Sequence, residues 1–429
     1  MSEHPYGKGE TDWFGQDRFG IFIHWGLYSL AARHEWVKNK ERISTADYQK
    51  YFDTFEPDLY DPKSWARLAR EAGMKYFVVT TKHHEGFCLW DTKHTDYKAT
   101  KTSLGRDLLR EMVDAFRAEG LKVGFYYSLL DWHHEEYTPD IFHPQRDDGE
   151  FKKSCEGRDM KVYAEYMRQQ VRELLTDFGR IDLLWFDFSY PEKMKGKDEW
   201  ESEKMIKMIR ELQPHIMVNN RLDLEGSGDF VTPEQYQPKE APKNPDGTPA
   251  VWEACQTLSG SWGYHRDEMT WKNSEQVLTM LIDGVSKGGN MLMNVGPNAR
   301  GEIDDRATDV LLKVGKWMRV NGRSIYGCKE APLEWQTPDD CRFTYHPESR
   351  RLYLHIFSWP FKKIHLTGLA DKIKYVQFLH DASEVLFRVK EIKGEHDNLS
   401  ENTNTDEVIL LLPVVKPKVE IPTIEIYLK

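Results

Sequence analysis

Long apolar runs, paired cysteines and a signal-like N-terminus are all missing from this sequence. No stretch approaches the ~18–20 consecutive apolar residues that a membrane-spanning helix needs. The first residues carry neither a basic nor an apolar segment, so we expect no secretory signal and a cytoplasmic location. The five cysteines are scattered and form no CxxC pair, which argues against a disulfide framework and a cysteine-ligated zinc site.

An excess of positive charge is also absent. The 429-residue chain has 59 Lys and Arg against 70 Asp and Glu, a formal net charge of −11. Such a chain is a poor candidate for binding a phosphate backbone, so we expect neither nucleic acid nor a membrane as a partner. The sequence does not determine the oligomeric state, and a homo-oligomer is one of the possibilities. Aromatic residues, in contrast, make up 13% of the chain, which rules out disorder as the main state and leaves ring faces for a sugar.

Up to about residue 320, short apolar runs alternate with amphipathic segments. The runs predict buried parallel strands at 20–26, 76–81, 122–128, 182–188, 216–219, 251–255 and 290–295. The amphipathic segments predict helices at 64–72, 107–119, 159–178, 199–212, 274–287 and 305–320, the first with Asp61 and Pro62 at its start. This alternation indicates an α/β fold, a distorted (β/α)8-type (TIM-like) barrel over residues 1–330. A doubly wound sheet is the competing fold, and the lack of GxGxxG after the first strand disfavours its nucleotide-binding form.

The pattern changes after residue 330. Short alternating or β-branched runs at 351–357, 374–378, 384–389, 408–412 and 423–428 are separated by polar turns. We therefore expect a C-terminal antiparallel β-sandwich domain over residues 331–429.

In a (β/α) barrel, the residues at the carboxyl ends of the strands face the active site. This rule selects polar and aromatic residues from every predicted strand: His24, His83, His84, Tyr127, Asp187, Arg221, Glu253 and Asn294. Taken singly, each histidine or tryptophan is more often a packing or hydrogen-bonded residue than a ligand. Their convergence at one end of the barrel predicts a single pocket.

Asp187 lies in the apolar run LLWFDF, where a carboxylate is costly to bury without a partner. It is either a member of a structural ion pair or a nucleophile or general acid/base. Retaining glycoside hydrolysis needs two carboxyl groups flanking the scissile bond. Glu234 and Glu253, both downstream of Asp187, are the candidate partners.

The histidines also invite a metal hypothesis. However, adjacent histidines on a strand, such as His83 and His84, point to opposite faces. The sequence contains no HxH and no HExxH, so we expect no metal.

Several longer strings resemble the family 29 α-L-fucosidases. They are RFGIFIHWG at 18–26, KHHEGFCLW at 82–90, GFYYS at 124–128, WEAC at 252–255, GSWGY at 260–264 and NMLMNVGP at 290–297. The matches run in order over about residues 13–330, whereas the C-terminal region matches only in kind. The resemblance implies a retaining, exo-acting α-L-fucosidase with no cofactor and no metal, acting on fucosylated oligosaccharides or glycoconjugates.

The resemblance also assigns roles to individual residues. Asp187 corresponds to the family nucleophile, and Glu234 is the first choice for the acid/base, with Glu253 second and Glu35 third. Residues that correspond to the family's sugar ligands are His24, Glu35, Trp36, His83, His84, Tyr127, Arg221 and Trp262. Among these, Trp262 falls where an aromatic ring meets the C5 methyl group.

Two other function classes stay open. A catalytically silent carbohydrate-binding protein could use the same fold, although Asp187 and the several acidic candidates weigh against it. A metal-dependent amidohydrolase-type barrel is the other class, and insensitivity to a chelator would exclude it.

Overall fold

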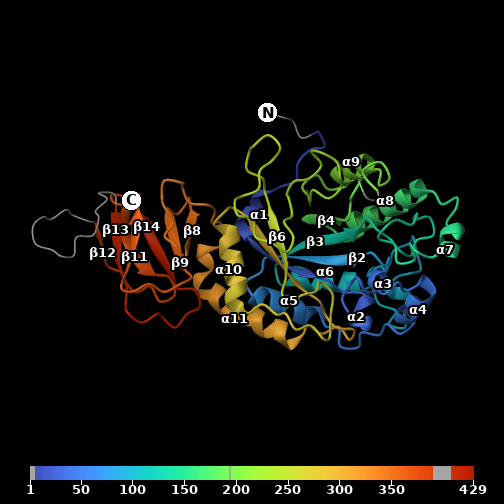
Figure 1. The fold of residues 1–429 in the computed structure, drawn as a ribbon, viewed down its shortest axis with the longest axis horizontal. Helices are drawn as coiled ribbons and strands as arrows, with labels where there is room; N and C mark the ends of the chain where they lie inside the picture. Colours follow the sequence, from blue (N-terminus) through green and yellow to red (C-terminus); the bar gives the residue numbers. More distant parts are fainter. Residues whose placement is uncertain (1–4, 193–194, 390–406) are drawn as a thin grey trace, which may run out of the picture.

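The computed structural model describes residues 5–192, 195–389 and 407–429 (Figure 1). Two antiparallel sheets lie at one end of the molecule and a parallel α/β unit at the other, with α10 and α11 between them (Figure 1). This is the TIM-like barrel followed by a β-sandwich that the sequence predicts. None of the helices among these residues is long and apolar enough to cross a membrane.

The parallel sheet has seven strands in the order β5-β4-β3-β2-β1-β7-β6. They are β1 (Phe19–Ile23), β2 (Tyr76–Lys82), β3 (Lys122–Ser128), β4 (Leu183–Asp187), β5 (Met217–Val218), β6 (Glu253–Thr257) and β7 (Asn290–Val295). Nearly every strand residue is buried, because helices cover the outside and a second apolar cluster fills the inside. Two-sided burial is why these strands appear in the sequence as continuous apolar runs.

The two edge strands, β5 and β6, do not pair with each other. The segment 229–235 lies between them instead, with parallel bridges from Phe230 to Asn219, from Val231 to Trp252 and from Glu234 to Cys255. This irregular segment completes the ring of backbone contacts in place of an eighth strand. It also brings Glu234 to the carboxyl end of the barrel.

Six longer helices pack around the sheet, as the apolar stripes in the sequence predict: α5 (Pro62–Glu71), α6 (Leu108–Ala118), α8 (Met160–Asp177), α9 (Ser202–Leu212), α10 (Ser274–Val285) and α11 (Asp305–Asn321). The side chain of Asp61 caps α5 by accepting a hydrogen bond from the Lys63 N–H, and Pro62 is the first helical residue, as predicted. Shorter helices occupy the connections: α1 (Asp12–Asp17), α2 (Tyr28–Ala31), α3 (Val37–Lys40), α4 (Thr45–Asp53) and α7 (Gly149–Ser154).

The C-terminal residues form two antiparallel sheets, in the orders β10-β13-β12 and β11-β14-β9-β8. Their strands are β8 (Cys341–His346), β9 (Arg351–Ile356), β10 (Lys363–Thr367), β11 (Ile373–Phe378), β12 (Phe387–Val389), β13 (Glu407–Leu411) and β14 (Thr423–Leu428). Strands β8 and β10 are not among the strands predicted from the sequence, although CRFTYH and KIHLT both alternate between apolar and polar residues. Arg342 pairs with Asp283 of α10, and the Trp317 indole of α11 donates to the carbonyl of Ile421. The boundary at residues 330/331 stays a prediction.

Candidate active site

A cavity opens where the carboxyl ends of the parallel strands meet. It encloses about 430 Å³ of empty space, part of it open to solvent. Its lining comes from widely separated parts of the chain: Phe22, His24, Glu35, Trp36, His83, His84, Tyr126, Trp185, Asp187, Phe188, Tyr190, Arg221, Glu234 and Trp262. Nine of the sequence candidates therefore lie together here.

Asp187 is the last residue of β4, and its carboxylate is fixed from two sides. Oδ1 accepts a 2.6 Å bond from a guanidinium nitrogen of Arg221, and Oδ2 accepts a 2.8 Å bond from the hydroxyl of Tyr126. The side chain is 14% exposed, so it still reaches the cavity. Burial among apolar strand residues is therefore offset by one ion pair and one hydrogen bond.

Glu234 shares the same arginine. The second guanidinium nitrogen of Arg221 donates to Glu234 Oε2 at 2.7 Å, and the ring of Trp185 lies 4.3 Å from the guanidinium carbon. Partial burial raises the pKa of Glu234 above its ordinary value, the nearby charge of Asp187 adds to the rise, and Arg221 opposes it. The cavity thus holds one carboxylate locked by two donors and a second carboxyl group inclined to keep a proton.

Three histidines form one wall of the cavity. His24 follows β1, and His83 and His84 follow β2, with the last two ring centroids only 4.0 Å apart. The expectation that His83 and His84 point to opposite faces is wrong, because β2 ends at Lys82 and the alternation ends with it. Among the described residues no group of three or more His, Cys, Asp or Glu side chains is placed to hold a metal ion.

Aromatic rings supply the rest of the wall. The ring centroid of Trp36 lies 4.9 Å from that of His84 and 5.1 Å from that of Phe188. The ring centroids of Trp262 and His24 are 5.1 Å apart. Glu35 Oε2 accepts a 2.8 Å bond from the backbone N–H of Gly263, which ties the loop carrying Trp262 to the loop carrying Trp36. The two loops therefore contact each other where they line the cavity.

Tyr127 does not lie in the cavity, contrary to the prediction from the sequence. Its hydroxyl donates to Gln170 of α8, outside the barrel, and its ring packs beside Lys82, so it does not line the cavity. The neighbouring Tyr126 faces inward and bonds Asp187 in its place. Successive strand residues point to opposite faces, so an error of one position moves a side chain to the other side of the sheet.

Glu253 is also placed away from the cavity. It is the first residue of β6, at the amino end of the barrel, and it is wholly buried. The Tyr76 hydroxyl donates to its Oε2, and burial raises the pKa of Glu253 to about 8. Glu253 does not line the cavity that holds Asp187, so its selection as the second-choice acid/base is wrong.

Four cavity residues besides Tyr126 escaped the sequence analysis: Phe22, Trp185, Phe188 and Tyr190. A signal for two of them was present. Phe22 lies two positions before His24, and Trp185 lies two positions before Asp187, so each shares the face of a candidate already chosen.

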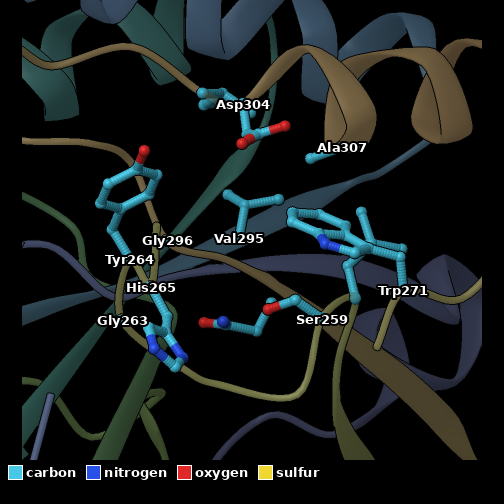
Figure 2. Close-up of a pocket in the computed structure, with 12 residues that line it drawn as sticks. Ser259, Gly263, Tyr264, His265, Trp271, Val295, Gly296, Asp304 and Ala307 are labelled. Atoms are coloured by element: carbon cyan, nitrogen blue, oxygen red, sulfur yellow. The ribbon is translucent and has the colours of Figure 1, made fainter. Parts of the chain in front are cut away.

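A second, smaller cavity is lined by the segment that follows Trp262 in the chain and by residues at and beyond the end of β7 (Figure 2). Its lining includes Tyr264, His265 and Trp271 from that segment, and Val295 and Asp304 from the end of β7 and beyond. Asp304 is its one acidic lining residue, and it is paired with Arg306. A site with one paired carboxylate does not fit two-carboxylate chemistry, so the first cavity remains the candidate active site.

Comparison with known proteins points to one family. The family model described as alpha-L-fucosidase matches residues 7–323. Among solved structures, alpha-L-fucosidase isoenzyme 1 from Paenibacillus thiaminolyticus is 46% identical, with a TM-score of 0.91 and 100% of each chain covered. The GH29 alpha-L-fucosidase of Bacteroides thetaiotaomicron, in a trapped covalent intermediate with 2-fluoro-fucosyl fluoride, is 28% identical with a TM-score of 0.83, covering 99% of each chain.

A curated relative agrees with the solved structures. The alpha-L-fucosidase of Dictyostelium discoideum is 26% identical over 439 aligned residues, which cover 95% of this chain and 89% of the relative. The similarity therefore extends beyond the barrel into the C-terminal sheets.

Proposed function

This chain belongs to the α-L-fucosidase family, glycoside hydrolase family 29, and from that membership we propose that it releases terminal α-L-fucosyl residues from fucosylated glycans with retention of configuration. The observation that carries the proposal is the shared arginine. Arg221 bonds Asp187 through one nitrogen and Glu234 through the other, so both carboxyl groups are held beside one cavity. Retaining hydrolysis requires two carboxyl groups with different roles.

In the first step, an Asp187 oxygen attacks C1 of the fucosyl residue while the bond from C1 to the glycosidic oxygen breaks. Glu234 gives its proton to the departing oxygen, so the leaving group departs as a neutral alcohol. The product is a covalent β-fucosyl ester of Asp187. Arg221 and Tyr126 donate to the two oxygens of Asp187 and hold the carboxylate in a fixed orientation before the attack.

In the second step, Glu234, now ionised, takes a proton from water as the water oxygen attacks C1. The ester bond breaks, Asp187 regains its carboxylate and α-L-fucose is released. Two inversions at C1 give net retention. The raised pKa of Glu234 suits a group that must first donate a proton and later accept one.

Recognition of the sugar falls to the remaining lining residues. The polar side chains His24, His83, His84 and Glu35 line the cavity together with Trp262. We assign the polar residues to the hydroxyl groups of the sugar and Trp262 to its C5 methyl group. Because L-galactose replaces that methyl with CH2OH, we expect a strong preference for L-fucosides over L-galactosides.

The test uses an aryl α-L-fucoside and follows the reaction by proton NMR. The first-formed free sugar should be the α anomer, and the matching L-galactoside should react far more slowly. Incubation with 2-fluoro-fucosyl fluoride, then digestion and mass mapping, should place the fucosyl label on Asp187. No turnover of any fucoside would indicate a silent binding protein, and a β anomer as first product would overturn the retaining mechanism.

A further inference from the structure

Two of the cavity histidines are held by a hydrogen bond at the ring nitrogen that faces away from the cavity. His24 Nδ1 lies 2.6 Å from Asn294 Oδ1, and His84 Nδ1 lies 2.6 Å from Ser128 Oγ. Asn294 is in β7 and Ser128 ends β3, and both are almost fully buried. The partners of these two residues decide which nitrogen of each histidine carries the proton.

For His24, the deciding contact is a backbone carbonyl. The Asn294 amide nitrogen donates to the carbonyl oxygen of Trp262 at 2.7 Å. A carbonyl can only accept, so the amide group of Asn294 cannot be turned the other way. Its oxygen therefore faces His24, and because that oxygen also only accepts, His24 must carry its proton on Nδ1.

For His84, the deciding contact is another carbonyl. The Ser128 hydroxyl has a single proton, and it lies 2.9 Å from the carbonyl oxygen of Leu130, which only accepts. Ser128 donates its one O–H to that carbonyl, so its oxygen accepts the hydrogen bond from His84 Nδ1. His84 therefore also carries its proton on Nδ1.

We infer that Asn294 and Ser128 are positioning residues that hold His24 and His84 as neutral Nδ1–H tautomers, so that the lone pairs of both Nε2 atoms face the sugar and accept hydrogen bonds from two of its hydroxyl groups. The identity of the sugar rests on the proposed function, but the tautomers do not. Neither Nε2 atom has a hydrogen-bond partner among the described residues, and neither is sealed from the cavity. His84 Nε2 lies 4.0 Å from Asp187 Oδ2, too far for a direct bond.

The surroundings favour the neutral form of both rings. Burial lowers the pKa of His24 and of His84 well below the ordinary histidine value, and the neighbouring His83 adds to the effect. His83 itself provides an internal contrast. Its buried Nδ1 lies 3.6 Å from Glu85 Oε2 and has no hydrogen-bond partner among the described residues, so no contact of this kind fixes its tautomer.

The direct test is a long-range proton–nitrogen NMR spectrum of protein labelled with ¹⁵N-histidine. In the unliganded wild type, His24 and His84 should both appear as Nδ1–H tautomers, assigned by loss of signals in His24→Asn and His84→Asn. Ser128→Ala should move the tautomer balance of His84 alone, and Asn294→Ala that of His24 alone. Ser128→Thr, which keeps the hydroxyl, should restore the wild-type signal.

A matched control removes a hydroxyl that does not touch a histidine. Thr81 is buried on β2 and donates to the carbonyl of Tyr126 at 2.7 Å. Thr81→Val should leave both histidine signals unchanged. If Nε2–H tautomers appear in the wild type, or if Thr81→Val moves the signals as Ser128→Ala does, the inference is overturned.

The functional readout compares L-fucose with its 2-, 3- and 4-deoxy and deoxyfluoro analogues as competitive inhibitors. Fluorine cannot donate a hydrogen bond. At the two positions read by His24 and His84, the fluoro sugar should bind no better than the deoxy sugar, each about tenfold weaker than fucose. The deoxy and deoxyfluoro sugars changed at the hydroxyl that contacts His84 should bind Ser128→Ala as tightly as they bind wild type. These sugars have already lost the hydrogen bond to His84 Nε2, so the substitution removes nothing more.

The two hypotheses fail separately. Fluoro sugars that bind better than deoxy sugars at all three positions would show that the cavity donates, and would overturn this inference while leaving fucosidase activity intact. Absence of any fucoside turnover would overturn the proposed function while leaving the NMR result in place.

Discussion

The two ends of the barrel use acidic side chains in opposite ways. At the carboxyl end, Asp187 and Glu234 share Arg221, reach a cavity and are 14% and 39% exposed. At the amino end, Glu253 is wholly buried, bonded by Tyr76, and no cation pairs with it among the described residues. Its pKa of about 8 means that it is mostly protonated at neutral pH.

The difference shows what separates a reacting carboxyl group from a packed one. A pair of carboxyl groups needs a cation to offset its burial and an opening for substrate, and Arg221 and the cavity supply both. Among the residues that the structure describes, Glu253 has no cation beside it and no opening to substrate, so it stays neutral inside the barrel and packs beside the ring of Tyr76. Gly20 leaves room for that ring, because a Cβ there would clash with it. The next four predictions test this comparison, from the largest expected effect on activity to the smallest.

Asp187→Gly should lower the turnover rate about 10⁴-fold or more, because it deletes the proposed nucleophile. Azide should then rescue the variant on an aryl fucoside with a good leaving group and yield the β-configured azide. Circular dichroism should show an unchanged fold. Near wild-type turnover without azide would contradict the assignment.

Glu234→Ala should lose about 10²–10⁴-fold on an oligosaccharide, whose leaving group needs a proton, and little on a substrate with an acidic phenol. Azide should accelerate the variant and give the α-configured azide. The alkaline limb of the pH–rate profile should flatten, since that limb reports loss of the proton from Glu234. Glu253→Ala and Glu35→Ala are the parallel controls. The same leaving-group dependence in Glu35→Ala would move the role to Glu35, and in Glu253→Ala it would contradict the placement of Glu253 at the far end of the barrel.

Tyr126→Phe and Tyr127→Phe compare a tyrosine that bonds Asp187 at the cavity with its neighbour, which bonds Gln170 outside the barrel. Losing a hydrogen bond to the Asp187 carboxylate should lower kcat/KM about 10–100-fold in Tyr126→Phe. Tyr127→Phe should leave kcat/KM within about twofold, but it deprives buried Gln170 of a partner and should cost about 1–3 kcal/mol of unfolding free energy. Steady-state kinetics and urea unfolding on both variants decide, and the reverse pattern would contradict the placement.

Glu253→Gln should change activity least and act on stability instead. Between about pH 4.5 and 8 the native protein keeps a proton on Glu253 that the unfolded chain releases, so this residue makes the native state less stable as pH rises. The neutral glutamine removes that dependence. The unfolding free energy of Glu253→Gln minus that of wild type should therefore increase from pH 5 to pH 8, and a flat difference would contradict the raised pKa.

Much of the site was predictable because barrel geometry selects the residues at strand ends. His24, His83, His84, Asp187 and Arg221 follow from that rule and line the cavity. The choice between Tyr126 and Tyr127 did not follow. Parallel strands buried on both faces have apolar residues at every position, so the sequence carries no alternation to show which tyrosine points inward.

By itself, the sequence determined the succession of strands and helices, the barrel with its C-terminal sheets, and the set of polar residues near one end, because apolar periodicity and helix caps are local signals. Only the tertiary structure decided which acidic residue joins Asp187. Glu234 reaches it because the irregular segment 229–235 fills the gap between β5 and β6, while Glu253 begins β6 at the far end. That choice depends on strand register and on contacts between distant segments, and neither leaves a periodic trace in the local sequence.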